Sequence, residues 1–181
     1  RWNRKFAFRP VVDGRFLPAP VLDQVAAGTC LMPSTLLGFT RDECADFVDT
    51  KSAGDAPNSR VLSHVSADVF MEVERRHAAL LPGLSAVQRR LRMLTAEEYE
   101  IPSIRLAQAL AAQGTPVWMY RFDGVREESG CMPATHVADL PLWWGHPPGP
   151  QRQFPAGVKP VADAMHAALI AFVGGASLDE E

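Results

Sequence analysis

The run TPVWMYRFD (Thr115–Asp123) is apolar or aromatic on both sides of an extended chain, which leaves few folds open to this sequence. A strand with one face in water alternates apolar and polar residues, whereas a parallel strand covered by helices on both faces is apolar on both. The shorter run STLLGFT (Ser34–Thr40) is also rich in apolar and β-prone residues, and it ends directly in the charged RDECAD. The two runs therefore predict buried strands whose ends lead into polar segments.

Helical patterns lie between and after these strands. Residues 66–80 begin at Ser66, which can cap a helix, and they repeat apolar side chains at the helical spacing. The segment PGLSAVQRRLRML (82–94) repeats apolar residues in the same way, with Ser85 as its cap. An amphipathic helix over about 159–173 is expected to end the pattern.

A further helix is expected between Thr95 and Gly114. Thr95 and Glu98 have the spacing of a capping box, and Gly114 can end a helix. Residues 124–157 contain proline and glycine throughout and are expected to form a long loop. Strands and helices in this order predict an α/β fold, and the length fits one domain over 1–181.

Composition excludes several classes of protein. The 18 basic and 21 acidic residues give a net charge of −3, so nucleic acid is not an expected partner. The three cysteines form no CxxC pair and no two histidines have the spacing of metal ligands, so no metal is expected.

The longest apolar stretch, AMHAALIAFVGGA (164–176), is too short to span a bilayer. Scattered thiols favour a reducing, cytoplasmic compartment; no targeting segment is visible, and the start at Arg1 is typical of sequence from within a longer protein.

Chemistry-bearing side chains follow both predicted strands. Asp42 and Glu43 come directly after the first strand, and His136 lies in the segment after the second. Sites in α/β sheets form at the carboxyl ends of strands, so a carboxylate and an imidazole could meet there. The carboxylate would accept a hydrogen bond from Nδ1 while Nε2 acts as a base. Spacing alone leaves the alternatives open: Glu43 as a helix cap, and His136 as a loop histidine bonded to backbone.

Four segments together resemble the type B carboxylesterases, the family of the cholinesterases and para-nitrobenzyl esterases. LLGFTRDECADF (36–47) is similar to the family's Gly-x-x-x-Asp-Glu-Gly stretch, and THVADLPLWWG (135–145) to its His-x-x-Asp/Glu-Leu-Pro segment. FRPVVDGRFLPAP (8–20) resembles the segment before the acid, and EIPSIRLAQALAAQGTPVWMYRFD (100–123) the helix and strand before the histidine. The order and spacing of the four segments carry the resemblance.

The resemblance implies an α/β-hydrolase fold with a Ser-Glu-His triad and no cofactor. Glu43 would be the triad acid and His136 the base, whereas Asp42 and Asp139 match family positions outside the triad. The sequence departs from the family at Cys44, where glycine is usual; cysteine adopts a positive φ less readily than glycine and could change the loop backbone.

The nucleophile has no candidate in this sequence. Such hydrolases carry their serine in G-x-S-x-G before the acid, and no G-x-S-x-G occurs here. The near match around Ser85 lacks the second glycine and lies between acid and base, which favours a helix cap. We therefore expect the C-terminal part of an ester hydrolase, inactive alone, with an N-terminal half that carries the serine as its partner. Uncovered apolar faces make self-association the other expectation.

Two tryptophans and two alternative functions complete the predictions. Trp143 and Trp144 follow the histidine; adjacent tryptophans belong to a core or an interface in most proteins, and here they could instead line the pocket of a small-molecule ester. The alternative to an enzyme is a catalytically inactive, esterase-like interaction domain. A further alternative is a different α/β enzyme completed by its own serine or cysteine.

Overall fold

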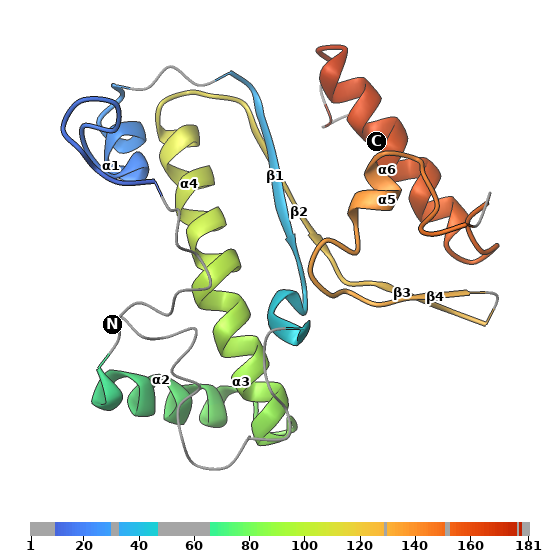
Figure 1. Ribbon diagram of the computed structural model, residues 1–181, viewed down its shortest axis with the longest axis horizontal. Coiled ribbons are helices and arrows are strands. Elements are labelled where there is room, and N and C mark those ends of the chain that lie inside the picture. The colour runs from blue at the N-terminus through green and yellow to red at the C-terminus, as the bar shows by residue number, and fades with distance from the viewer. Residues whose placement is uncertain are drawn as a thin grey trace. The chain divides into compact units, whose positions relative to one another are not determined.

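The chain is described by a computed structural model that covers residues 10–29, 33–46, 66–128, 130–150, 153–176 and 178. The chain divides into two compact units (Figure 1). Unit 1 comprises Arg1–Thr35 and Phe47–Val117, and unit 2 comprises Leu36–Asp46 and Trp118–Glu181. Within the described ranges, no helix is long and apolar enough to cross a bilayer.

Unit 1 is helical, and local capping signals predict where some of its helices begin. Two of them start at serines whose Oγ accepts a backbone hydrogen bond, from the N–H of Val69 for Ser66 and from the N–H of Gln88 for Ser85. The Gln88 side chain also accepts from the Ser85 N–H, which completes a capping box. The helices are α1 (Val21–Ala26), α2 (Ala67–Leu80), α3 (Ala86–Thr95), the π-helix η4 (Ala96–Glu100) and α4 (Ile101–Ala112).

The prediction that Thr95 caps a new helix is wrong. A capping residue has an extended backbone, but Thr95 is the buried last residue of α3, with φ −60° and ψ −43°. The chain therefore continues from α3 through η4 into α4 without a break, which Figure 1 shows as one rod. Pro102 lacks the N–H that an α-helix needs, and it lies in the first turn of α4, directly after the wider π-helical turn of η4. The predicted end at Gly114, with φ 76°, is confirmed.

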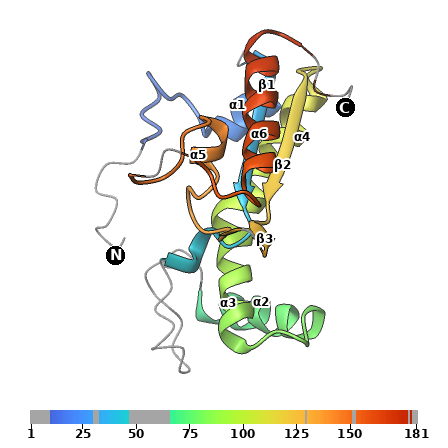
Figure 2. The ribbon, with the colours of Figure 1, turned by 90° about the vertical axis from the view of Figure 1, so that its right-hand side faces the viewer.

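Unit 2 is built on the strands β1 (Thr35–Thr40) and β2 (Val117–Phe122), which begin at its boundary with unit 1. The N–H of Thr35 donates to the carbonyl of Pro116, and the N–H of Arg41 donates to the carbonyl of Phe122. Both chains advance together between these two bonds, so the strands are parallel, as the sequence predicts. Figures 1 and 2 show them side by side.

Glycine at one position lets β1 and the neighbouring tyrosine come close. A Cβ built on Gly38 would lie 2.3 Å from ring atoms of Tyr120. The tyrosine ring therefore occupies the space of the missing side chain, and any larger residue at position 38 would displace it.

The expectation of a long loop over 124–157 is wrong. This stretch contains an antiparallel hairpin of β3 (Val125–Glu127) and β4 (Gly130–Met132), and the short helix α5 (Leu140–Trp143). Strands of three residues are too short for a periodic signal, which explains the error. The terminal helix α6 (Lys159–Val173) is confirmed, and its Phe172 meets Trp118 of β2 edge to face.

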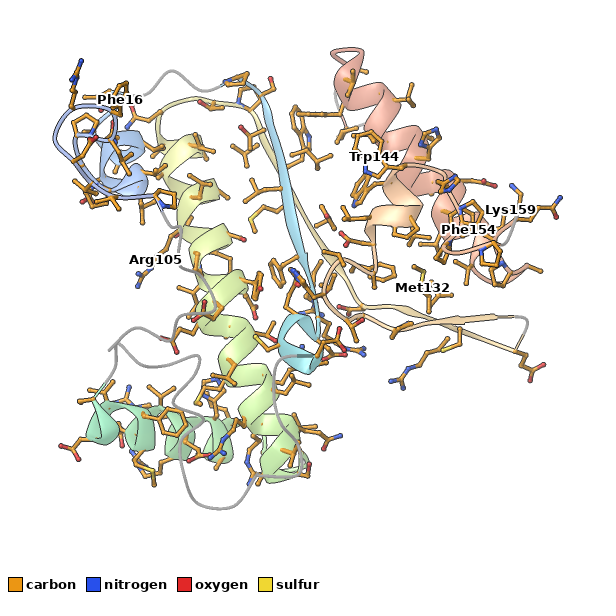
Figure 3. The ribbon with its side chains drawn as sticks, in the orientation of Figure 1. Phe16, Arg105, Met132, Trp144, Phe154 and Lys159 are labelled. Atoms are coloured by element: carbon orange, nitrogen blue, oxygen red, sulfur yellow. The ribbon has the colours of Figure 1, made fainter. Side chains whose placement is uncertain are left out.

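The core of unit 2 joins these elements. Its buried residues come from β2, β3, the segment before α5, α5, α6 and the residue before α6. Met132 and Phe154 pack around it (Figure 3). The His166 Nδ1–H donates to the carbonyl of Trp143 at 2.8 Å, which ties α6 to the end of α5. The buried members are Phe122, Val125, Ala134, Leu142, Val158 and Ala162.

Candidate active site

Glu43 is a buried carboxylate at the start of the 3-10 helix η2 (Glu43–Asp46), three residues after the end of β1. The residue is only 5% exposed. Its Oε1 accepts the backbone N–H of Thr40 at 2.7 Å, so the chain turns back on itself and holds its own side chain. A charge this deeply buried needs hydrogen bonds on its oxygens, and the Thr40 N–H supplies one of them.

The backbone brings the segment after β1 next to the segment before His136. The N–H of Asp42 donates to the carbonyl of Ala134 at 2.9 Å, and Asp42 and Thr135 form a parallel bridge beyond the strands. Glu43 and His136 each follow one residue after this bridge. The two side chains are therefore placed opposite each other by main-chain hydrogen bonds.

His136 completes the second hydrogen bond of Glu43. The Nδ1–H of His136 donates to Oε2 of Glu43 at 2.6 Å, and the side chain of His136 remains 36% exposed. An ionised carboxylate can only accept, so this contact favours the tautomer with its proton on Nδ1. Nε2 is then the nitrogen that can take a proton from another group. The expected contact is present, and the catalytic role of the pair stays a prediction.

The turn that carries His136 has an unusual backbone. Val137 has φ 58°, and it is the non-glycine residue with positive φ in the described part of the chain. β-branched residues rarely adopt this conformation, because Cβ then crowds the backbone. The turn closes through the N–H of Ala138, which donates to the carbonyl of Thr135, and the N–H of Leu140, which donates to the carbonyl of Val137.

A second hydrogen-bonded pair lies beyond this turn, and the sequence did not indicate it. The Tyr120 hydroxyl donates to Oδ2 of Asp139 at 2.6 Å, and Asp139 is 5% exposed. Burial raises the pKa of Tyr120 far above its usual range, and the hydrogen bond and the charge of Asp139 raise it further. Asp139 was singled out only as a family position, and no local pattern pairs it with Tyr120.

The remaining predicted residues have different surroundings. Asp42 pairs with Arg41 at 2.8 Å, which raises the pKa of the Arg41 guanidinium. Cys44 is buried, and its φ is not positive, so replacing the family's glycine does not force a strained backbone there. Trp143 meets Tyr120 edge to face at 4.8 Å, whereas Trp144 is 68% exposed at the end of α5 (Figure 3). A substrate-pocket role for the two tryptophans stays a prediction.

The described residues include an apolar cavity but no candidate metal site. Across these ranges, no group of three or more histidine, cysteine or acidic side chains could hold a metal ion. A cavity of about 180 Å³ lies in unit 1, lined mainly by apolar side chains of α2, the end of α3, η4 and the start of α4. Its lining residues from α2 are Val69, Phe70, Val73 and His77.

Comparisons with known proteins give one consistent result. The family model described as "Carboxylesterase family" matches residues 1–175. The para-nitrobenzyl esterase of Bacillus subtilis (strain 168) is 28% identical over 175 residues, which is 91% of this chain and 34% of that protein. The crystal structure of carboxylesterase EST55 from Geobacillus stearothermophilus matches with a TM-score of 0.66 and 29% identity, over 91% of this chain and 36% of that one.

A further solved structure, titled as a thermophilic pNB esterase, matches with a TM-score of 0.52 and 28% identity, over 76% of this chain and 28% of that one. The chain thus spans about a third of the length of these relatives. These matches confirm the fold class expected from the sequence, part of an α/β-hydrolase fold.

Proposed function

Because this chain belongs to the carboxylesterase family, we propose that it forms part of an enzyme that hydrolyses carboxylic esters, with Glu43 as the acid and His136 as the base of a Ser-Glu-His triad. The observation that carries this proposal is the hydrogen bond between His136 Nδ1 and Glu43 Oε2 at 2.6 Å. A buried acid that accepts from one ring nitrogen orients the other nitrogen for proton transfer.

The proposed reaction proceeds in two halves. In the first, Nε2 of His136 takes the proton of a serine hydroxyl as the serine oxygen attacks the ester carbonyl, and Glu43 stabilises the resulting imidazolium. His136 then gives this proton to the leaving alcohol, which produces an acyl-enzyme and an alcohol. In the second, His136 takes a proton from water as the water oxygen attacks the acyl carbon. The bond between the acyl carbon and the serine oxygen then breaks, the carboxylic acid is released, and His136 returns the proton to the serine.

The serine and the backbone N–H groups that stabilise the oxyanion belong to the proposed N-terminal partner. The chain contains no G-x-S-x-G and spans about a third of its relatives, which supports this division. The complete protein, meaning this chain together with the segment that carries the serine, is therefore the proposed catalytic unit. The proposed substrate is a small-molecule ester, and self-association of the chain alone stays a second proposal for its apolar faces.

The test compares hydrolysis of p-nitrophenyl acetate by this chain alone and by the complete protein. We expect activity only in the complete protein, and we expect His136→Ala to reduce kcat at least about 10³-fold, as loss of a triad base does. His146→Ala is the matched control, because His146 is an exposed histidine of the same unit. Full activity of His136→Ala would contradict the proposal, and activity of the chain alone would contradict the assignment of the serine to the partner. An inactive complete protein would favour the alternative, an esterase-like interaction domain.

A further inference from the structure

The turn after His136 is held in a conformation that its own sequence disfavours. Val137 has φ 58° although it is β-branched, and its side chain is half exposed, so packing on the valine does not explain the conformation. A strained residue persists when the structure on both sides determines its backbone. Contacts on both sides of Val137 must therefore hold the backbone in this conformation.

Before His136, the chain is fastened by main-chain hydrogen bonding. The Asp42–Ala134 hydrogen bond and the Asp42–Thr135 bridge attach it to the segment that carries Glu43. This attachment fixes where the histidine's backbone begins, but it does not fix the direction in which the chain leaves.

After His136, a hydrogen bond between two side chains, those of Tyr120 and Asp139, holds the chain. Asp139 is buried, and its Oδ2 accepts the Tyr120 hydroxyl at 2.6 Å. The main-chain carbonyl of Asp139 also accepts the N–H groups of Leu142 and Trp143 at 3.0 and 3.2 Å, so the same residue anchors the first turn of α5. The side chain of Asp139 thus ties the far end of the histidine turn to β2.

Tyr120 is itself fixed on three sides. Its ring fills the space over Gly38 and meets Trp143 edge to face, and its hydroxyl donates to Oδ2 of Asp139. These contacts hold the side chain of Tyr120 in one position. The strand pair β1–β2 thereby sets the position of Asp139.

We infer that Tyr120 and Asp139 are positioning residues, whose hydrogen bond holds the strained turn at Val137 so that the imidazole of His136 meets Glu43. The expected effect on kcat rests on the proposed function, whereas the positioning of His136 by Tyr120 and Asp139 does not depend on it. Neither residue has a proton-transfer or nucleophilic step in the proposed reaction, so each is expected to act through His136.

The first experiment uses Tyr120→Phe, which keeps the ring and removes the donor. Tyr99→Phe is the matched control, because the chain has two tyrosines and Tyr99 lies on η4 in unit 1. In the complete protein we expect Tyr120→Phe to lower kcat about ten- to a hundredfold, since a small misplacement of a catalytic group has effects of that size. KM is expected to stay within about twofold of the parent value, because substrate binding is not altered.

Two further variants separate positioning from simple loss of stability. Asp139→Asn keeps an oxygen that can accept from Tyr120 and should retain most of the activity, whereas Asp139→Ala should lose as much as Tyr120→Phe. Val137→Gly combined with Tyr120→Phe should recover part of the lost kcat, because glycine adopts a positive φ without strain. A purely structural role predicts no such recovery in the folded protein.

A readout independent of activity separates failure of this inference from failure of the proposed function. In 15N-labelled protein, the Nδ1–H proton of His136 should give a low-field NMR signal that Tyr120→Phe shifts or broadens and Tyr99→Phe leaves unchanged. An unchanged signal in folded Tyr120→Phe, with kcat equal to that of Tyr99→Phe, would overturn the inference. An inactive complete protein whose signal still responds to Tyr120→Phe would overturn the esterase proposal alone.

Discussion

Glu72 in unit 1 and Glu43 in unit 2 each accept hydrogen bonds from two other residues, yet their surroundings differ. Glu72 lies on the surface of α2 and accepts from Arg75 at 2.8 Å and from Arg76 at 2.7 Å, both within two turns of the same helix. Glu43 is buried, and one of its partners, His136, is 93 positions away in sequence. Local pairs on a helix surface have small effects on stability, whereas a buried pair from distant segments determines the geometry of a site.

The largest expected effect in this comparison is that of Glu43→Gln on catalysis. The amide cannot stabilise the imidazolium of His136, so kcat of the complete protein should fall about 10³–10⁴-fold. Asp46→Asn is the matched control, because Asp46 is an exposed carboxylate on the same helix η2. Steady-state kinetics with p-nitrophenyl acetate measures both, and equal losses in the two variants would remove the special role of Glu43.

Replacing a buried leucine by alanine in each unit compares how much core packing contributes to stability and to catalysis. Leu142 in unit 2 and Leu110 in unit 1 are both essentially unexposed, at 0% and 1%. Leu142→Ala and Leu110→Ala should each lower the free energy of unfolding by about 2–5 kcal/mol. Only Leu142→Ala should also lower kcat of the protein that remains folded, because Leu142 lies in α5 directly after the histidine turn. Equal effects of both variants on kcat would contradict a local link between α5 and His136.

A valine-to-glycine pair compares a strained position with a relaxed one. Val137→Gly should raise the free energy of unfolding by about 1 kcal/mol, because relief of a positive φ exceeds the entropy that glycine adds to the unfolded chain. Val69→Gly, at an exposed position of α2, should lower it by a few tenths of a kcal/mol. Urea unfolding measures both, and the same sign in both variants would show that Val137 stores no strain.

The smallest effect concerns acid stability of α2. The hydrogen bonds from Arg75 and Arg76 lower the pKa of Glu72 from 4.5 to about 2. The contribution of Glu72 is therefore present above pH 4.5 and is lost as the pH falls from 4.5 towards about 2. Glu72→Gln should lose part of this pH dependence, followed as helix content by circular dichroism. An identical acid profile in parent and variant would show that the pairs on α2 contribute nothing.

Local signals in the sequence predict α2, α3 and the end of α4 better than they predict the connections of unit 2. Ser66, Ser85 and Gly114 act within one helical turn, so their roles can be recognised without tertiary structure. The prediction of a helix cap at Thr95 is wrong because the spacing of Thr95 and Glu98 is also compatible with the middle of a continuous helix. The hairpin over 125–132 was missed because its strands have three residues each.

The sequence predicts the parts of the candidate site that follow a general rule of α/β folds. It does not predict the parts that depend on which residues of β1 and β2 lie opposite each other. Strand ends in α/β folds gather functional residues, and the family resemblance added Glu43 and His136 by position. The Tyr120–Asp139 pair depends instead on Gly38 lying opposite Tyr120 in the β1–β2 pairing, which no local pattern records.

The protonation site of His136 tests the central claim most directly. The 15N chemical shifts of its imidazole, recorded in the complete protein at a pH where the ring is neutral, distinguish a proton on Nδ1 from a proton on Nε2. The hydrogen bond to Glu43 predicts the Nδ1–H tautomer in the parent protein and a changed Nδ1 signal in Glu43→Gln. A ring protonated on Nε2, with shifts that Glu43→Gln leaves unaltered, would contradict the pairing on which the proposed esterase mechanism depends.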